Sequence, residues 1–214
     1  MSSGKAFNYQ KSFLQNYFEV FTPDLKGFGE NADMPYPYSV DDYVQSVKEY
    51  AYKMGIVKPH VVAHSFGARL VLKIAGDSPD YFNKIVITGG AGLKPKQSIV
   101  RIVKRGVFNL LKPLLGREKL KSFYSPEYQA LSPIMQQSFI KIVNEHLDEY
   151  AKKIENQTLL IYGDKDKQTP LYMAKRLNGY IKNSQLSVYK DAGHFAFIDC
   201  PIKFNVEVRE FLLS

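Results

Sequence analysis

The sequence contains a single cysteine, Cys200, among its 214 residues. One cysteine cannot form a disulfide within the chain, which fits a reducing cytoplasm. No run of about 18 apolar residues occurs, so we expect no transmembrane helix and no stable membrane insertion. The first ten residues, MSSGKAFNYQ, lack the apolar segment that a signal peptide requires. We therefore predict a cytoplasmic protein.

The patterns of several ligand-binding classes are also missing. No cluster of Cys, His and carboxylate residues has the spacing typical of a zinc site. Gly27-Phe28-Gly29 is too short and wrongly continued for a dinucleotide fingerprint, and no Gly-rich phosphate loop occurs. We expect neither a metal nor a cofactor, and a small molecule as the substrate.

Acidic residues are too few to balance the basic ones, and the formal net charge is +8. Much of the excess lies in one stretch that only Glu118 opposes: Lys94, Lys96, Arg101, Lys104, Arg105, Lys112, Arg117, Lys119 and Lys121. Such a stretch either attracts anionic substrates, acidic lipid or nucleic acid, or forms a solvated helical face. We favour the solvated face, because no nucleic-acid motif accompanies it and we expect no nucleic-acid partner.

The hydrophobic pattern alternates between short strands and helices. Strands are predicted at 17–25, 60–64, 84–88, 158–162 and 186–189, and helices at 40–54, 66–75, 171–179 and 202–213. Ser39 is a good N-cap for the first of these helices, with Asp42 three residues later. Alternating strands and helices indicate an α/β fold with a mostly parallel sheet.

Residues from about 93 to 150 change character, because strand-like runs disappear and prolines break helical patterns into short pieces. We therefore predict a core formed by residues 1–92 and 151–214, with an inserted helical cap at 93–150.

The pentapeptide Ala63-His64-Ser65-Phe66-Gly67 places a serine between a buried strand and a helix. Small residues two before and two after the serine suit a nucleophile elbow, whose sharp turn would make larger side chains collide with backbone. The turn exposes the serine hydroxyl and directs the Phe66 amide toward a developing oxyanion. A serine that merely caps the helix is the alternative.

A serine nucleophile needs a base and a carboxylate that orients it. Of the four histidines, His60 opens a predicted strand and reads as an edge residue, and His146 reads as a surface residue. His64 adjoins Ser65 in sequence, but we expect its side chain to point away from that of Ser65. His194 follows the last predicted strand, in Asp191-Ala192-Gly193-His194. Gly163-Asp164-Lys165-Asp166 follows the strand before it and offers two carboxylates. The order Ser, Asp, His is that of α/β-hydrolases.

Over nearly its whole length the chain resembles the α/β-hydrolase superfamily, in its branch of small esterases, peroxidase-like enzymes and C–C hydrolases. The resemblance rests on four segments, FTPDLKGFG, AHSFGARL, LLIYGDKDKQTP and DAGHFAFIDCP. It implies helices on both faces of the sheet, a helical cap, and Asp166 rather than Asp164 as the triad acid. The family also begins with strands and a His-Gly loop that supplies an oxyanion amide. No His-Gly occurs near Met1, so we expect the N-terminal strands to be missing.

Together these features predict a serine hydrolase that cleaves a small ester, thioester, amide or C–C substrate. Ser65 would attack, His194 would act as base, Asp166 would orient it, and the Phe66 amide would stabilise the oxyanion. The alternatives are a non-catalytic binding protein of this fold, an inactive N-terminally truncated fragment, or a cofactor-free lyase or peroxidase-like enzyme with the same triad.

Overall fold

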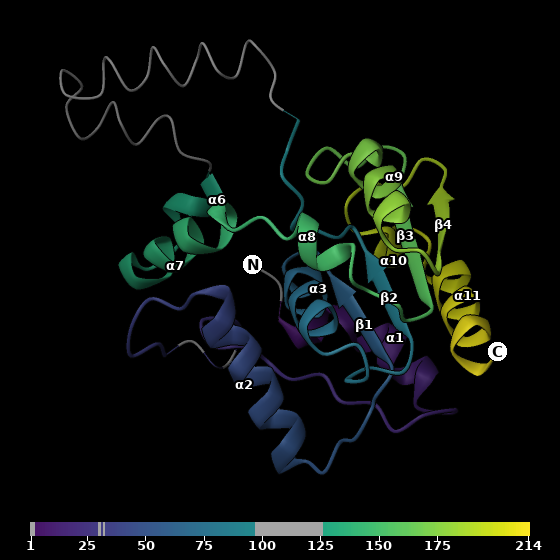
Figure 1. Cartoon of the computed structure of the whole chain (residues 1–214), viewed down its shortest axis with the longest axis horizontal. Helices are drawn as coiled ribbons and strands as arrows, with labels where there is room; N and C mark the ends of the chain where they lie inside the picture. Colours follow the sequence, from purple (N-terminus) through teal and green to yellow (C-terminus); the bar gives the residue numbers. More distant parts are fainter. Residues whose placement is uncertain (1–2, 30, 32, 97–125) are drawn as a thin grey trace.

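The computed structural model describes residues 3–29, 31, 33–96 and 126–214 (Figure 1). Four strands of the described chain form one sheet. They are β1 (Val61–His64), β2 (Ile85–Thr88), β3 (Thr158–Gly163) and β4 (Ser184–Tyr189). They pair in the order β1-β2-β3-β4, and every pairing is parallel. All four lie within or close to predicted strand positions.

The register brings the carboxyl ends of the strands to one edge of the sheet. His64 of β1 pairs with Thr88 of β2, which pairs with Ile161 of β3. Gly163 at the end of β3 pairs with Tyr189 at the end of β4. The loops that follow the strands therefore meet at this edge, which is where ligands bind in open parallel sheets.

Helices cover both faces of the sheet (Figure 1). They are η1 (Gly4–Phe7), α1 (Asn8–Leu14), α2 (Val40–Lys53), α3 (Phe66–Asp77), α6 (Pro126–Gln129), α7 (Pro133–Asn144), α8 (Asp148–Ala151), α9 (Leu171–Tyr180), α10 (Ala196–Asp199) and α11 (Pro201–Leu213). Side chains of α3, α8 and α9 form one hydrophobic cluster with the sheet, and those of α1, α10 and α11 form another on the opposite face. The predicted α/β fold with helices on both faces is confirmed.

Helix α2 shows why local sequence was informative. The Ser39 side chain accepts a hydrogen bond from the Asp42 amide, and the Asp42 carboxylate accepts one from the Ser39 amide at 2.7 Å. This capping box satisfies two amides that the first helical turn leaves unpaired. The predicted helix start is therefore confirmed.

Helix α3 is buried along most of its length and also holds α7 in place. Its Arg69 guanidinium donates to the carbonyls of Ile142 and Glu145, each at 2.8 Å. Lys73 of α3 pairs with both Glu145 and Asp41. Arg69 thus supplies donors to backbone carbonyls at the C-terminal end of α7, where carbonyls lack partners within the helix, and Lys73 pairs with carboxylates beside them.

The strand predicted at 17–25 is wrong. This segment forms no ladder, and β1 is the end strand of the sheet that the described residues form. Apolar residues in it, Phe18 and Val20, pack instead against the cluster of α1 and α11. A β-rich sequence becomes a strand only where a neighbouring strand pairs its backbone, and here packing takes up the apolar side chains.

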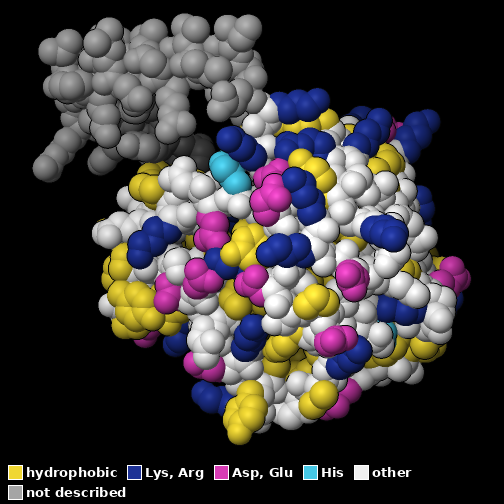
Figure 2. Space-filling view, in the orientation of Figure 1, with side chains coloured by type: hydrophobic (Ala, Val, Ile, Leu, Met, Phe, Trp, Pro, Cys, Tyr) yellow, Lys and Arg dark blue, Asp and Glu magenta, His cyan; other side chains and the backbone are white. Residues whose placement is uncertain are grey.

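The segment predicted as a cap is helical in the part that the structure describes, where α6, α7 and α8 follow one another. Residues 97–125, with most of the basic stretch, lie outside the described residues. On the face in Figure 2, basic and acidic side chains are interspersed. Among the residues described, no helix is long and apolar enough to cross a membrane.

Candidate active site

Ser65 lies at the turn between β1 and α3, with φ 49° and ψ −106°. This backbone conformation is rare for a residue with a side chain and costs about 1–3 kcal/mol. Hydrogen bonds hold the turn in place. The Ser65 amide donates to the Thr88 carbonyl at 3.2 Å, and the Ser65 carbonyl accepts from the Ala91 amide at 3.2 Å. Strained residues held in this way are concentrated at functional sites.

The small residues around Ser65 contact each other less tightly than the elbow pattern suggests. A Cβ built on Gly67 would lie 3.6 Å from the Cβ of Ala63, which is an ordinary van der Waals contact. The turn therefore accommodates alanine at either position, whereas the space beyond a methyl group is limited by the facing residue. This explains why Ala63 can stand where many such elbows have glycine.

Phe66 begins α3, so its amide is one of those that a helix leaves without an internal partner. The Phe66 ring stacks on Phe28, with centroids 5.4 Å apart, and meets the Tyr43 ring edge-on at 5.0 Å. These contacts fix the first turn of the helix from the side of α2 and the loop before it. The amide predicted to stabilise an oxyanion is thus on a rigid part of the fold.

Asp166 and His194 are in direct contact. The His194 Nδ1 atom lies 2.8 Å from Asp166 Oδ2, and both side chains are buried. Each comes from a loop at the same edge of the sheet, after β3 and after β4. Asp164, the other carboxylate considered, is exposed. The structure therefore brings together the acid and base that sequence analysis selected.

Several donors fix the Asp166 carboxylate. Its Oδ1 accepts hydrogen bonds from the amides of Gln168 and Thr169, at 2.8 and 2.9 Å. The Thr169 hydroxyl donates to Oδ2 at 2.7 Å and lies 3.3 Å from His194 Nδ1. Burial acts to raise the pKa of Asp166, but the hydrogen bonds from His194 and Thr169 outweigh it and hold the pKa below its usual range. Asp166 is therefore an anion at neutral pH.

Sequence analysis did not single out Thr169 or assign a role to His64. A hydroxyl three residues after Asp166 is the signal that could have revealed Thr169, since Asp side chains commonly accept bonds from the turn that follows them. His64, beside Ser65, contacts the His194 ring at a centroid distance of 4.7 Å. The two histidines are 130 residues apart in the sequence, so the sequence alone does not indicate this contact.

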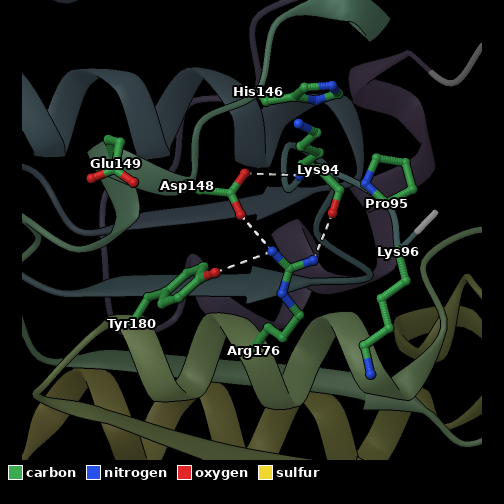
Figure 3. Close-up of a pocket in the computed structure, with 8 residues that line it drawn as sticks. All are labelled: Lys94, Pro95, Lys96, His146, Asp148, Glu149, Arg176 and Tyr180. Atoms are coloured by element: carbon green, nitrogen blue, oxygen red, sulfur yellow. Dashed lines mark hydrogen bonds and ion pairs between the residues drawn. The ribbon is translucent and has the colours of Figure 1, made fainter.

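A surface hollow is lined by residues at both ends of the 93–150 segment and by α9, and none of Ser65, Asp166 and His194 lines it (Figure 3). The Asp148 carboxylate accepts from the Lys94 amide at 2.8 Å and from Arg176 at 2.7 Å, while Arg176 also donates to the Lys94 carbonyl at 2.6 Å. These bonds give the hollow a structural role. In the part of the chain described, no three His, Cys, Asp or Glu side chains gather closely enough to hold a metal ion.

The buried acid–histidine pair, the strained serine and the parallel sheet define the class of protein. The model of the alpha/beta hydrolase family matches residues 3–207, and the chain belongs to this family.

Relatives of known name are distant. The chain is 27% identical to pyrrolizixenacetamide deacetylase of Xenorhabdus hominickii, over 94% of this chain and 83% of that protein. It is 25% identical to 2-hydroxymuconate semialdehyde hydrolase of Pseudomonas putida, over 90% of this chain and 76% of the relative. It is also 23% identical to Protein ABHD8 of Bos taurus, over 94% of this chain, but it spans about half of that protein's length (51%).

Solved structures agree in fold. The meta-cleavage product hydrolase CumD of Pseudomonas fluorescens IP01 superposes with a TM-score of 0.75 at 25% identity, over 99% of this chain and 86% of the other. An esterase of Exiguobacterium antarcticum superposes with a TM-score of 0.78, over 100% of this chain and 88% of the other. Its identity of 20% shows likeness of fold alone.

Proposed function

We propose that the chain is a serine hydrolase acting on a small ester, thioester, amide or C–C substrate through Ser65, His194 and Asp166. The observation that carries the proposal is the 2.8 Å bond between the buried His194 and Asp166 side chains. It lies at the sheet edge where Ser65 stands at φ 49°. A buried carboxylate bonded to a histidine Nδ1 leaves Nε2 free to take a proton, which a general base must do.

In the acylation step, the Ser65 hydroxyl oxygen bonds to the substrate carbonyl carbon while its proton passes to His194 Nε2. The Phe66 amide donates to the oxyanion of the tetrahedral intermediate. His194 then returns the proton to the leaving group as its bond to the carbonyl carbon breaks, and an acyl ester on Ser65 remains.

Water cleaves the acyl ester by the same route. His194 takes a proton from water as the water oxygen attacks the acyl carbon, and the proton returns to the Ser65 oxygen when it leaves. The negative charge of Asp166 stabilises the imidazolium in both steps and keeps the proton of neutral His194 on Nδ1.

The test uses a fluorophosphonate probe, peptide mass mapping, and a screen of short- and long-chain p-nitrophenyl esters. The adduct should map to the peptide containing Ser65, and Ser65→Ala should abolish labelling and lower turnover by several orders of magnitude. Ser12→Ala, at an exposed position of α1, is the matched control and should behave as wild type. An adduct on another residue, or turnover that survives Ser65→Ala, would contradict the proposal.

Product analysis distinguishes a hydrolase from a lyase. A hydrolase releases a carboxylic acid with incorporation of one oxygen atom from labelled water, whereas a lyase does not. A binding protein would show neither labelling nor turnover.

A further inference from the structure

His64 is the last residue of β1 and directly precedes Ser65, yet its ring packs against residues that follow β4, at the other end of the chain. The ring centroid lies 4.7 Å from that of His194, 4.9 Å from that of Phe195 and 5.1 Å from that of Phe197. The strand that carries the proposed nucleophile thereby contacts the loop that carries the proposed base.

A hydrogen bond accompanies this packing. The Nε2 atom of His64 lies 3.1 Å from the backbone carbonyl oxygen of His194. A carbonyl only accepts, so His64 must carry its proton on Nε2. Burial, followed by the charge of His194, lowers the pKa of His64 to about 4, which keeps the ring neutral near pH 7.

His194 is therefore held at two points. Asp166 fixes its ring through Nδ1, and His64 fixes its backbone carbonyl. Because the ring and the main chain of His194 are both held, the direction in which its Nε2 atom points is set. This atom must face the Ser65 hydroxyl for proton transfer. The chemical steps do not themselves use His64.

We propose that His64 is a positioning residue, which holds the His194 backbone through its Nε2–H donor and so sets the His194 imidazole for proton transfer with Ser65. This inference rests on the proposed function. It assigns His64 no contact with substrate.

Two substitutions separate the donor from the ring. His64→Phe keeps a flat ring and removes the donor. His64→Gln removes the ring but places an amide N–H at about the position of Nε2. Because a misplacement of about 1 Å can cost about 10²-fold in rate, His64→Phe should lower kcat by about 10- to 100-fold with little change in KM. His64→Gln should recover most of that loss.

The proton on His194 Nδ1 gives a readout that needs no turnover. Bonded to Asp166, it should give a low-field proton NMR resonance that His194→Ala removes. His64→Phe should shift or broaden this resonance, and His64→Gln should retain it. Thermal unfolding of each variant confirms that it folds, and an unfolded His64→Phe is replaced by His64→Leu.

The outcomes are distinct. A kcat and a resonance that do not change in His64→Phe would overturn the inference. Equal losses in His64→Phe and His64→Gln would also overturn it, because packing rather than the donor would then matter. If wild type itself shows no Ser65-dependent labelling, the proposed function fails, and the resonance alone still tests whether His64 positions His194.

Discussion

Gly89 lies directly against His194. A Cβ built on Gly89 would be 2.8 Å from the His194 carbonyl oxygen and 3.1 Å from its Nδ1 atom. Gly89 follows β2 and has a φ of +52°, a region that residues with a side chain rarely adopt. The end of β2 therefore leaves room for the histidine that the loop after β4 delivers.

Replacing Gly89 by alanine should reduce both stability and activity. The left-handed backbone costs an alanine about 1–2 kcal/mol. The added methyl group should also displace His194 and lower kcat/KM by about 10- to 100-fold. Ester hydrolysis and urea unfolding measure the two effects.

Gly55→Ala is the matched control, because Gly55 has a φ of +66° and no atom beyond its chain neighbours lies within 4 Å of its Cβ position. It should lose similar stability and keep full activity. Equal activity in both variants would show that catalysis does not require the space beside His194 that Gly89 leaves.

Asp166→Asn should lower kcat by about 10⁴-fold, because the neutral amide neither stabilises the imidazolium nor selects the Nδ1 tautomer. Asp164→Asn should have little effect, since the Asp164 side chain is exposed, and its backbone amide, which donates to the Tyr189 carbonyl at 3.1 Å, is kept in the variant. Steady-state kinetics on one ester measures both. A larger loss for Asp164→Asn would refute the assignment of the acid.

Acid should destabilise the protein through His64. Its folded pKa of about 4 lies below the value of about 6.5 in an unfolded chain. The unfolded chain therefore binds a proton that folded His64 does not, and stability is lost as the pH falls from about 6.5 toward 4. The groups facing His64 are His194 and Asp166, and the lowered pKa of Asp166 acts in the same direction at lower pH.

Urea unfolding at pH 7 and pH 4.5 tests this expectation. The fall in the free energy of unfolding should be smaller in His64→Gln than in wild type, by about 2–3 kcal/mol at most. His146→Gln, at an exposed position, should leave the fall unchanged. The same fall in all three proteins would mean that His64 titrates alike in both states.

Asp148→Ala should lower the free energy of unfolding by about 1–3 kcal/mol, because it leaves the Lys94 amide without its acceptor and removes the carboxylate that pairs with Arg176 (Figure 3). Glu149→Ala is the control, since Glu149 pairs only with the neighbouring Lys152 at the surface among the contacts described, and should change stability by about 0.5 kcal/mol or less. Similar losses would show that Asp148 contributes nothing beyond a surface ion pair.

The strands and helices that sequence predicted well are those with a local signal. β2 and β3 are continuous apolar runs, and α2 begins with a capping box. Ser65, Asp166 and His194 could be selected because each follows a predicted strand, and parallel strands end at one edge. The family resemblance was still needed to choose between Asp164 and Asp166.

The features that sequence did not predict depend on distant contacts. Helix α1 has no side-chain cap. Tertiary contacts hold it in place, such as the hydrogen bond from the Gln10 side-chain amide to the Phe197 backbone carbonyl at 2.8 Å. His64 and His194 are 130 residues apart, so nothing in the sequence connects them. The segment 17–25 has the composition of a strand, but composition cannot reveal whether a neighbour will pair with it.

Hydrogen bonds link the two ends of the connection between β2 and β3. The Leu147 amide donates to the Gly92 carbonyl at 2.9 Å, and Asp148 accepts from the Lys94 amide. The entropy of closing a chain grows so slowly that doubling the length between such points costs only about 0.6 kcal/mol. A change in the length of the stretch between these points should therefore cost little stability and leave the register of β2 and β3 as it is.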